Sequence, residues 1–300
     1  MKKIVEKIIM KVPYFRSLHK EIERYKRLQY YPPGHYYSPI VDYHAVKNSV
    51  NLWEASEPAN IDLNVKGQLE LLSNFPMYYN EIPWKNKKVK NLTYYFQNDF
   101  YSYTDGILLY SMIRYFAPKR IIEIGSGFSS ALMIDTNHLF FKNEIDLTFI
   151  EPYPARLNSL VDKQQEQNVT ILEKKVQEVP LEILGQLEKG DILFIDSSHV
   201  SKTGSDVNYI LFEILPRLKK GVIIHFHDIF YPFEYPKLWV YQGRNWNENY
   251  LLRAFLIGNE NYKILLFSDY LHKLKPEIFE KMPLLKRNTG GNIWLEKIED

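Results

Sequence analysis

The sequence predicts a doubly wound α/β fold: a mostly parallel sheet of seven strands with helices on both faces, after a helical, aromatic-rich N-terminal extension. Short apolar runs recur from residue 120 onward, and helical stretches separate the first five of them. Strands that alternate with helices form a parallel sheet, and wholly apolar strands are buried on both sides of it. The final two runs lack a clear crossover helix, so we expect an antiparallel strand at that end.

The expected elements follow from these patterns. The strands are RIIEIGSG from residue 120, 146–152, 168–174, 190–199, 221–228, 262–267 and 292–298, where TGGN marks a turn before the last. The helices between them are expected at 128–140, 154–166, 180–188 and 205–218, and two more precede the sheet at 66–82 and 104–116.

The N-terminal extension begins with a basic amphipathic helix expected over 4–28, which Pro13 breaks or kinks. Residues 1–29 carry nine Lys and Arg against three Glu. This pattern leaves two roles open, peripheral membrane contact and packing in a homo-oligomer. We place the domain boundary after residue 94, with an extension at 1–94 that covers substrate or mediates oligomerisation, and a cofactor-binding domain at 95–300.

Composition narrows the class of protein. The chain has no cysteine, which excludes disulfides and thiolate zinc sites and indicates a reducing compartment. Its net charge of +2 indicates no nucleic-acid partner. No apolar run reaches the ~18 residues of a membrane span. We expect a cytoplasmic protein.

The segment EIGSGFSS at 123–130 follows a strand and opens a helix. Gly125 and Gly127 allow a sharp turn, and the helix supplies unpaired amide donors to a ligand. The dinucleotide fingerprint fails here because Ser130 replaces its third glycine. Glu123 suits a cationic part of a ligand better than a pyrophosphate, and Glu151, at the end of the next strand, can accept both ribose hydroxyl protons.

Polar residues follow the fourth and fifth strands in IDSSH and HFHD. The strands are expected to be neighbours, ~5 Å apart, so Asp196, His199, His227 and Asp228 should converge at the carboxyl edge of the sheet. Such a group either binds a hard divalent cation or supplies a general base without metal. Alternation puts His225 on the same face as His227 but inside the strand, so we interpret His225 as structural.

These segments resemble class I S-adenosylmethionine-dependent methyltransferases, which have a Rossmann-like fold with an antiparallel last strand. The resemblance covers EIGSG, the acid at 151, GDILFID at 190–196 and the later strands, roughly residues 95–298. It implies S-adenosylmethionine as cofactor. The cofactor-binding residues that it implies are Glu123, Gly125, Ser126 and Gly127 around the methionine portion, Glu151 at the ribose, Gln177 near the adenine, and Asp196 or Ser197 near the sulfonium.

FID-x-x-H, followed by a strand that ends in His-Asp, resembles a smaller group: the metal-dependent sugar O-methyltransferases and their cephalosporin-hydroxylase-like relatives. The resemblance implies Asp196, His227 and Asp228 at a metal, Mg or Mn, with His199 as catalytic base and Asp228 as a second catalytic residue. His227 stands where that group often has Glu, which leaves manganese, a transition metal or no metal open. The implied acceptor is a sugar, a glycan or another hydroxylated small molecule.

Other segments are candidates for the acceptor side. Residues 241–256 present Arg244, Trp246 and Asn247, and the aromatic segment YPPGHYYSP could fold over the same crevice. Further candidates are Tyr101, Thr104 and Asp105 over the cofactor and Asp206 as a second contributor near the strand tips.

Two other functions stay open: a nucleotide-cofactor oxidoreductase on a similar sheet, and a non-catalytic glycan- or membrane-associated protein.

Overall fold

The computed structural model describes residues 11–49, 52–54, 57–161 and 168–299. Its backbone contacts divide the chain into two units. One unit holds the described residues up to Leu52 together with Lys237–Asn245, and the other holds Trp53–Pro236 and the described residues from Trp246 onward. The predicted boundary at residue 94 stays a prediction about folding, because the contacts divide the chain earlier, at Leu52.

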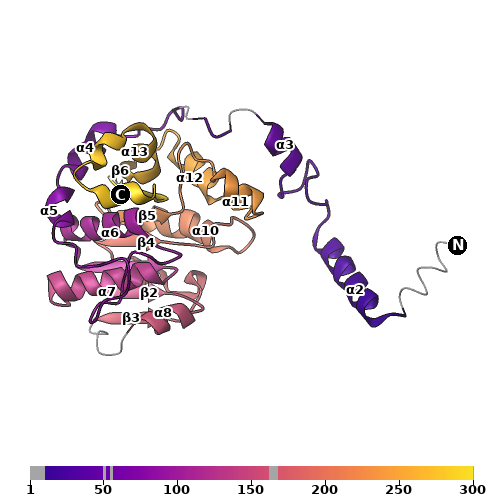
Figure 1. Cartoon of the computed structure of the whole chain (residues 1–300), viewed down its shortest axis with the longest axis horizontal. Helices are drawn as coiled ribbons and strands as arrows, with labels where there is room; N and C mark the ends of the chain where they lie inside the picture. The colour runs from indigo at the N-terminus through magenta and orange to yellow at the C-terminus, as the bar shows by residue number, and fades with distance from the viewer. Residues whose placement is uncertain (1–10, 50–51, 55–56, 162–167, 300) are drawn as a thin grey trace. The chain divides into compact units, whose positions relative to one another are not determined.

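The larger unit is built on one seven-stranded sheet in the order β3-β2-β1-β4-β5-β7-β6 (Figure 1). The strands are β1 (Arg120–Ile124), β2 (Asp146–Ile150), β3 (Val169–Leu172), β4 (Ile192–Ile195), β5 (Ile223–His227), β6 (Tyr262–Phe267) and β7 (Asn292–Lys297). All neighbours pair in parallel except β7, which runs antiparallel to both β5 and β6. The predicted fold class is confirmed, including the antiparallel last strand.

Helices lie on both sides of this sheet (Figure 1). They are α4 (Val65–Leu72), α5 (Phe75–Tyr79), α6 (Tyr103–Phe116), α7 (Phe128–Phe141), α8 (Ala155–Leu160), α9 (Leu181–Leu184), α10 (Asp206–Tyr209), α12 (Glu248–Leu256) and α13 (Ser268–Leu274). Short helical turns are η2 (Val176–Glu178), η3 (Ile210–Ile214), η4 (Leu215–Arg217), η5 (Pro276–Phe279) and η6 (Pro283–Arg287).

Four predicted helices are shorter than expected or interrupted. The helix expected over 66–82 forms two separate helices, α4 and α5. The helix expected over 180–188 is only α9, which ends at Gly185. The helix expected over 205–218 changes from α10 into a π-helical turn and then a 3₁₀ turn at Pro216, which has no amide hydrogen to donate. Of the helix expected over 154–166, α8 covers the first part, and 162–167 lie outside the described residues.

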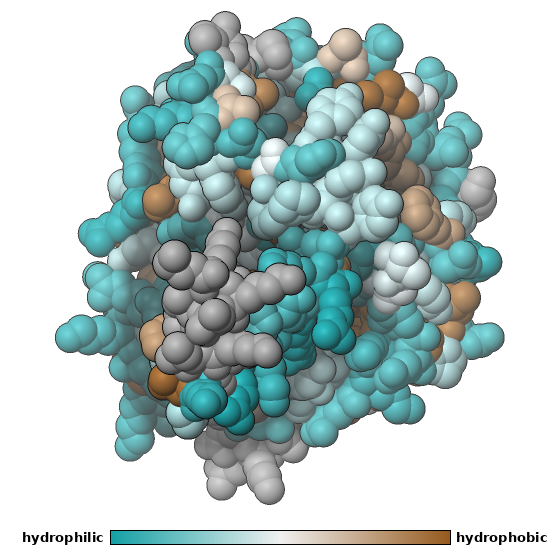
Figure 2. Space-filling view, turned by 90° about the vertical axis from the view of Figure 1, so that its right-hand side faces the viewer, coloured by the Kyte–Doolittle hydropathy of each residue, from teal (hydrophilic) through white to brown (hydrophobic). Residues whose placement is uncertain are grey.

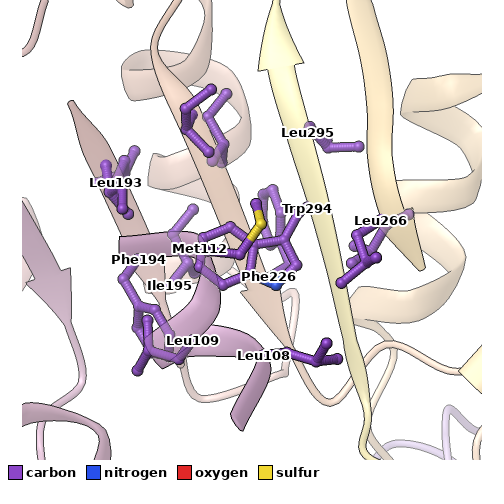
Figure 3. Packing of buried hydrophobic residues seen from close by; sticks show 14 of the residues in the cluster. Leu108, Leu109, Met112, Leu193, Phe194, Ile195, Phe226, Leu266, Trp294 and Leu295 are labelled. Carbon is purple, nitrogen blue, oxygen red and sulfur yellow. The ribbon is translucent and has the colours of Figure 1, made fainter. Parts of the chain in front are cut away.

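The core lies between α6 and the centre of the sheet. Leu108, Leu109 and Met112 of α6 lie over Phe194 of β4 and Phe226 of β5 (Figure 3). All five side chains are at most 1% exposed. This packing fixes the backbone of β4 and β5, and so the direction in which their carboxyl ends present side chains.

The smaller unit contains α2 (Pro13–Leu28), α3 (Tyr43–Asn48) and α11 (Lys237–Tyr241). Pro13 does not kink a longer helix among the described residues; it stands in the first turn of α2, where its missing N–H would have no helical partner. The part of the expected helix before residue 11 lies outside the described residues.

The surface in Figure 2 is largely hydrophilic, with hydrophobic residues in scattered places. Among the described residues, no helix has both the length and the apolar character needed to cross a bilayer.

Candidate active site

The turn after β1 brings the backbone of β1 against the end of β4. Gly125 has a φ of +84°, and a Cβ on it would lie 1.9 Å from the backbone oxygen of Asp196. The positive φ and the close approach of the Asp196 carbonyl both require glycine at this position. The amide of Gly125 also donates to the carbonyl of Ile150 at 3.0 Å. The glycine turn, residues 123–130, is therefore held by both neighbouring strands, as a cofactor-binding edge requires.

Glu123 is fully buried beneath this turn. The hydroxyls of Ser129 and Ser130 both donate to its carboxylate. Ser130 Oγ also accepts from the amide of Gly127 at 2.9 Å. Burial raises the pKa of Glu123 to about 8, against the lowering effect of the serine hydroxyls. Ser130, which breaks the dinucleotide fingerprint, thus has a defined role here: it links the buried acid to the turn.

The remaining predicted cofactor residues lie around the same edge. Glu151 accepts from the amide of Ser126 at 3.1 Å and from the amide of Tyr153 at 2.7 Å. The Ser126 hydroxyl is buried without a hydrogen bond among the described residues. Gln177 donates through Nε2 to the carbonyl of Gly204 at 3.0 Å, while its buried Oε1 has no partner in the described chain. The contacts of these side chains with ribose and adenine stay predictions.

The ends of β4 and β5 lie side by side. Ile195 pairs with Phe226, so the next residues, Asp196 and His227, stand opposite each other. His199 and Asp228 both have left-handed backbone, with φ values of +59° and +57°. Such conformations cost about 1–3 kcal/mol each and persist where the surroundings hold them. We call Asp196, His199, His227 and Asp228 the strand-tip cluster.

His199 lies between three carboxylates and is 5% exposed. Its Nδ1 is 2.8 Å from Glu248 Oε2, and its Nε2 is 3.4 Å from both Asp196 Oδ1 and Asp228 Oδ2. Burial lowers the pKa of His199, but the nearby carboxylates of Asp196 and Glu248 outweigh it and hold that pKa well above its usual range. Glu248 therefore orients the ring, and Nε2 faces the other members of the cluster.

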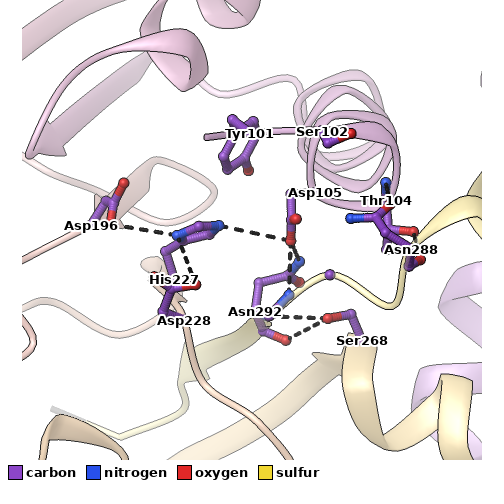
Figure 4. A network of polar contacts seen from close by, with 12 residues as sticks. Tyr101, Ser102, Thr104, Asp105, Asp196, His227, Asp228, Ser268, Asn288 and Asn292 are labelled. Carbon is purple, nitrogen blue, oxygen red and sulfur yellow. Dashed lines mark hydrogen bonds and ion pairs between the residues drawn. The ribbon is translucent and has the colours of Figure 1, made fainter. Parts of the chain in front are cut away.

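His227 lies in the same cluster and has carboxylates at both ring nitrogens (Figure 4). Its Nδ1 is 3.5 Å from Asp196 Oδ1 and 3.6 Å from Asp228 Oδ1, and its Nε2 is 3.9 Å from Asp105 Oδ1. Burial lowers the pKa of His227, but the charges of Asp228, Asp196 and Asp105 outweigh it and raise that pKa to about 10.

The pKa values of the two carboxylates in the cluster shift in opposite directions. Burial raises the pKa of Asp228, assisted by the neighbouring negative charges and opposed by the histidines. Burial also raises the pKa of Asp196, but the nearby imidazoles of His227 and His199 overcome it and hold that pKa well below its usual range. The strand-tip cluster therefore favours a positive charge close to Asp196.

The residues of the cluster fit a divalent cation. One ligand atom from each of Asp196, His227 and Asp228 can be chosen so that all lie within 4.8 Å of one another. Neither ring nitrogen of His227 makes a hydrogen bond within the described chain, although both are buried. Two carboxylates and one imidazole are a donor set for Mg²⁺, Mn²⁺ or a later transition metal. The predicted metal ligands thus converge, and whether they bind a metal stays a prediction.

His225, on the same strand, has a different environment. It is fully buried, stacked on Phe194 with ring centroids 3.9 Å apart and beside Trp294 at 4.5 Å. Neither of its ring nitrogens has a hydrogen-bond partner in the described chain, and burial holds its pKa well below the usual range. The geometry agrees with the interpretation of His225 as a neutral core residue.

Two residues at this site, Glu248 and Asn292, were not predicted from the sequence, and Tyr101, which was predicted over the cofactor, lies beside His227. Glu248, 1% exposed, was not singled out; its one signal is an acid in the first turn of the helix that follows Trp246. Asn292 donates through Nδ2 to Asp105 Oδ1 at 2.6 Å, which holds the carboxylate behind His227. Tyr101 lies with its ring centroid 5.2 Å from that of His227, and its hydroxyl has no partner among the described residues.

The other candidates have mixed outcomes. Ser197 Oγ donates to Glu248 Oε1 at 2.9 Å and accepts from the amide of His199 at 3.0 Å, so it supports the histidine. Trp246 packs on His199 with ring centroids 4.5 Å apart. Asn247 donates from its amide to the carbonyl of His199 at 3.0 Å.

Two of the remaining candidates, Asp206 and Thr104, make their hydrogen bonds outside the cluster. Asp206 accepts from the amide of Ser198 at 2.8 Å and orders the loop after β4. The Thr104 hydroxyl donates to the carbonyls of Leu285 and Asn288. Arg244 belongs to the smaller unit, where its guanidinium lies 3.9 Å from the centroid of the Trp239 ring.

Comparisons with known proteins bear on this edge of the sheet. Residues 122–229, from β1 to just beyond β5, match a family model described as a methyltransferase domain. An uncharacterised protein of Archaeoglobus fulgidus is 33% identical over 188 residues, which are 58% of this chain and 82% of that protein.

Two solved structures are similar at low identity. A methyltransferase of Podospora anserina with bound S-adenosylhomocysteine is 14% identical, covers 77% of this chain and 88% of its own, and superposes with a TM-score of 0.43. An O-methyltransferase of Streptomyces achromogenes in complex with S-adenosylmethionine is 15% identical, with coverage of 77% and 90% and a TM-score of 0.42. The family match shows that residues 122–229 form a methyltransferase domain, and the strand order and glycine turn around it are those of the class I S-adenosylmethionine-dependent methyltransferases.

Proposed function

We propose that this enzyme transfers the methyl group of S-adenosylmethionine to a hydroxyl of a sugar, a glycan or another hydroxylated small molecule, with His199 as general base. The observation that carries the proposal is the carboxylate–imidazole pair of Glu248 and His199, directed at Asp196 and Asp228 beside the glycine turn. A base needs one ring nitrogen oriented and the other directed at the reacting proton.

The chain's own groups supply the following steps. Glu248 accepts a hydrogen bond from Nδ1–H of His199, which fixes the ring. Because the pKa of His199 is raised, Nε2 releases its own proton first and then takes the proton of the acceptor hydroxyl. The acceptor oxygen forms a bond to the methyl carbon as the bond from that carbon to sulfur breaks, and S-adenosylhomocysteine leaves as a neutral thioether. Trp246, packed on His199, restricts the ring and excludes water from one of its sides.

Asp196, His227 and Asp228 would hold a divalent metal in this proposal. A cation there would replace the imidazolium charge that the carboxylates otherwise favour and would lower the pKa of a nearby acceptor hydroxyl. Asp105 stands behind His227 and would orient that ring, as carboxylates do for histidine ligands of metals. Mg²⁺ and Mn²⁺ suit the two carboxylates, and the imidazole favours Mn²⁺ or a later transition metal.

Both parts can be tested on the purified chain. Thermal unfolding should be measured with S-adenosylhomocysteine, NAD or NADP, and only S-adenosylhomocysteine should raise the midpoint temperature of unfolding. Transfer of labelled methyl groups from S-adenosylmethionine should then be measured on a panel of monosaccharides, sugar nucleotides and phenols, before and after chelation. Activity on a sugar hydroxyl that chelation removes and Mn²⁺ or Mg²⁺ restores supports both parts. Activity that chelation leaves intact contradicts the metal part, and preference for a phenol or an amine contradicts the sugar acceptor.

A further inference from the structure

One face of α2 is apolar and exposed. Phe15, Leu18, Ile22 and Tyr25 recur at three- and four-residue spacings, which places them along one side of the helix. Phe15 is 44%, Leu18 41% and Ile22 43% exposed, and none of the 16 residues of the helix is buried. Packing on its own unit does not account for this apolar face.

The opposite face of α2 is basic. At 100° per residue, Lys20, Arg24 and Arg27 lie together on the side away from Ile22. Residues 11–29 contain six Lys and Arg against two Glu, a net charge of +4. One of the two acids, Glu23, pairs with Lys26 at 3.0 Å within the helix. A helix with an apolar side, a basic side and low average hydrophobicity is the type that lies in a lipid interface.

The loop after α2 extends the same kind of surface with tyrosines. Tyr30 is 93% and Tyr36 91% exposed, and Tyr31 stacks on His35 with ring centroids 4.5 Å apart. A groove of about 600 Å³ lies where the end of α2 meets this loop, lined by side chains such as Ile22, Tyr25 and Tyr30. Tyrosine suits a boundary at which one end of the ring is in an apolar phase and the hydroxyl is in water.

We propose that this surface, residues 13–37, docks on an anionic lipid membrane. The charge pattern fits headgroups of negative charge, to which clustered Lys and Arg are attracted. A second copy of the chain fits less well, because a stable protein interface uses roughly 20–30 residues on each side, whereas the apolar face of α2 is a single row of side chains. A copy would also bring a second net positive helix to the first.

The test uses the full-length chain and vesicles of phosphatidylcholine alone or mixed with phosphatidylglycerol. Co-sedimentation should show binding to the mixed vesicles only, and added salt should weaken it. Lys20→Gln with Arg24→Gln should weaken binding on the order of 10-fold or more, from the loss of two charges near the surface. Leu18→Ser with Ile22→Ser should weaken it comparably without changing charge.

Lys87→Gln with Lys90→Gln is the matched control. It makes the same charge change in an exposed loop of the larger unit, so it should leave vesicle binding unchanged. Circular dichroism checks that every variant folds, and all the replaced side chains are exposed.

Three outcomes would overturn the proposal: no binding of the unaltered chain to the mixed vesicles, an equal loss in the control, or a dimer in sedimentation velocity that Leu18→Ser with Ile22→Ser dissociates while vesicle binding persists.

Discussion

The glycine turn and the strand-tip cluster lie at the same edge of the sheet, but they differ in how well their polar side chains are hydrogen-bonded. In the glycine turn, Glu123, Ser129 and Ser130 satisfy one another and the backbone. In the cluster, Asp196 and Asp228 face His199 and His227 at 3.4–3.6 Å, beyond good hydrogen-bond distance.

This difference separates two kinds of task. The polar side chains of the turn other than Ser126 are paired before any ligand arrives, so the turn can bind a common cofactor with little rearrangement. The cluster keeps charged groups close together in a buried place, and this costs free energy in the free protein. The arrangement becomes useful when a cation or a reacting proton enters. Reactivity is therefore expected at the cluster and cofactor affinity at the turn.

The largest expected effect on stability breaks the turn. Gly125→Ala adds a Cβ that would lie 1.9 Å from the carbonyl oxygen of Asp196, in addition to the strain of a positive φ. We expect a loss of about 3 kcal/mol or more in the free energy of unfolding, together with loss of S-adenosylhomocysteine binding. Gly190→Ala is the control: its φ is +88° but nothing lies within 4 Å of the added Cβ. It should lose only about 1–2 kcal/mol, the cost of the conformation alone. Equal losses in denaturant titrations would show that the close approach of β1 and β4 is unimportant.

The next effect concerns the cluster alone. Asp228→Asn should reduce Mn²⁺ affinity by ~100-fold or more, because loss of even an outer partner of a metal ligand costs 10–100-fold. Electron paramagnetic resonance of free Mn²⁺ measures this without any assay of turnover. Asp146→Asn, at the opposite end of the strands, removes the same charge and should leave the affinity unchanged. If both variants bind Mn²⁺ like the unaltered chain, the cluster is not its site.

A smaller effect tests the buried acid of the turn by pH. The pKa of Glu123 is raised from 4.5 to about 8, so between these values the unfolded chain has released a proton that the folded chain keeps. Stability should therefore fall as pH rises through this window, by at most about 1.4 kcal/mol per pH unit from this group. Glu123→Gln should flatten that part of the profile. An unchanged profile in chemical denaturation at several pH values would show that Glu123 ionises normally in the folded protein.

The smallest effect contrasts two histidines of one strand. His225→Phe replaces a neutral imidazole that lacks hydrogen bonds by a ring that can stack on Phe194, so stability should change by less than about 1.5 kcal/mol and turnover not at all. His227→Phe serves as the matched change two residues along, and it should abolish Mn²⁺ binding. Loss of turnover in His225→Phe with a normal thermal unfolding profile would give His225 a role that the structure does not indicate.

The sequence predicted the sheet well because its strands are wholly apolar and end in polar residues. The convergence of Asp196, His199, His227 and Asp228 followed from the expected pairing of two strands. Glu248 was missed because its one local signal, an acid in the first turn of a helix, also fits a plain helix start. Its role depends on α12 returning to His199 across 49 positions of sequence. Asp105 over the cofactor stays a prediction; its carboxylate also lies behind His227, where the start of β7 and the residue before it bring Asn292 and Gly291 to it.

In the proposed function, the strand-tip cluster performs methyl transfer while the glycine turn binds the cofactor. The most direct measurement compares His199→Asn with the unaltered chain for both S-adenosylhomocysteine affinity and the rate of labelled methyl transfer to a sugar acceptor. We predict an unchanged dissociation constant and a turnover lower by about 10²–10⁴-fold, the usual contribution of a general base. Normal turnover, or a loss that follows entirely from weaker cofactor binding, would contradict the account.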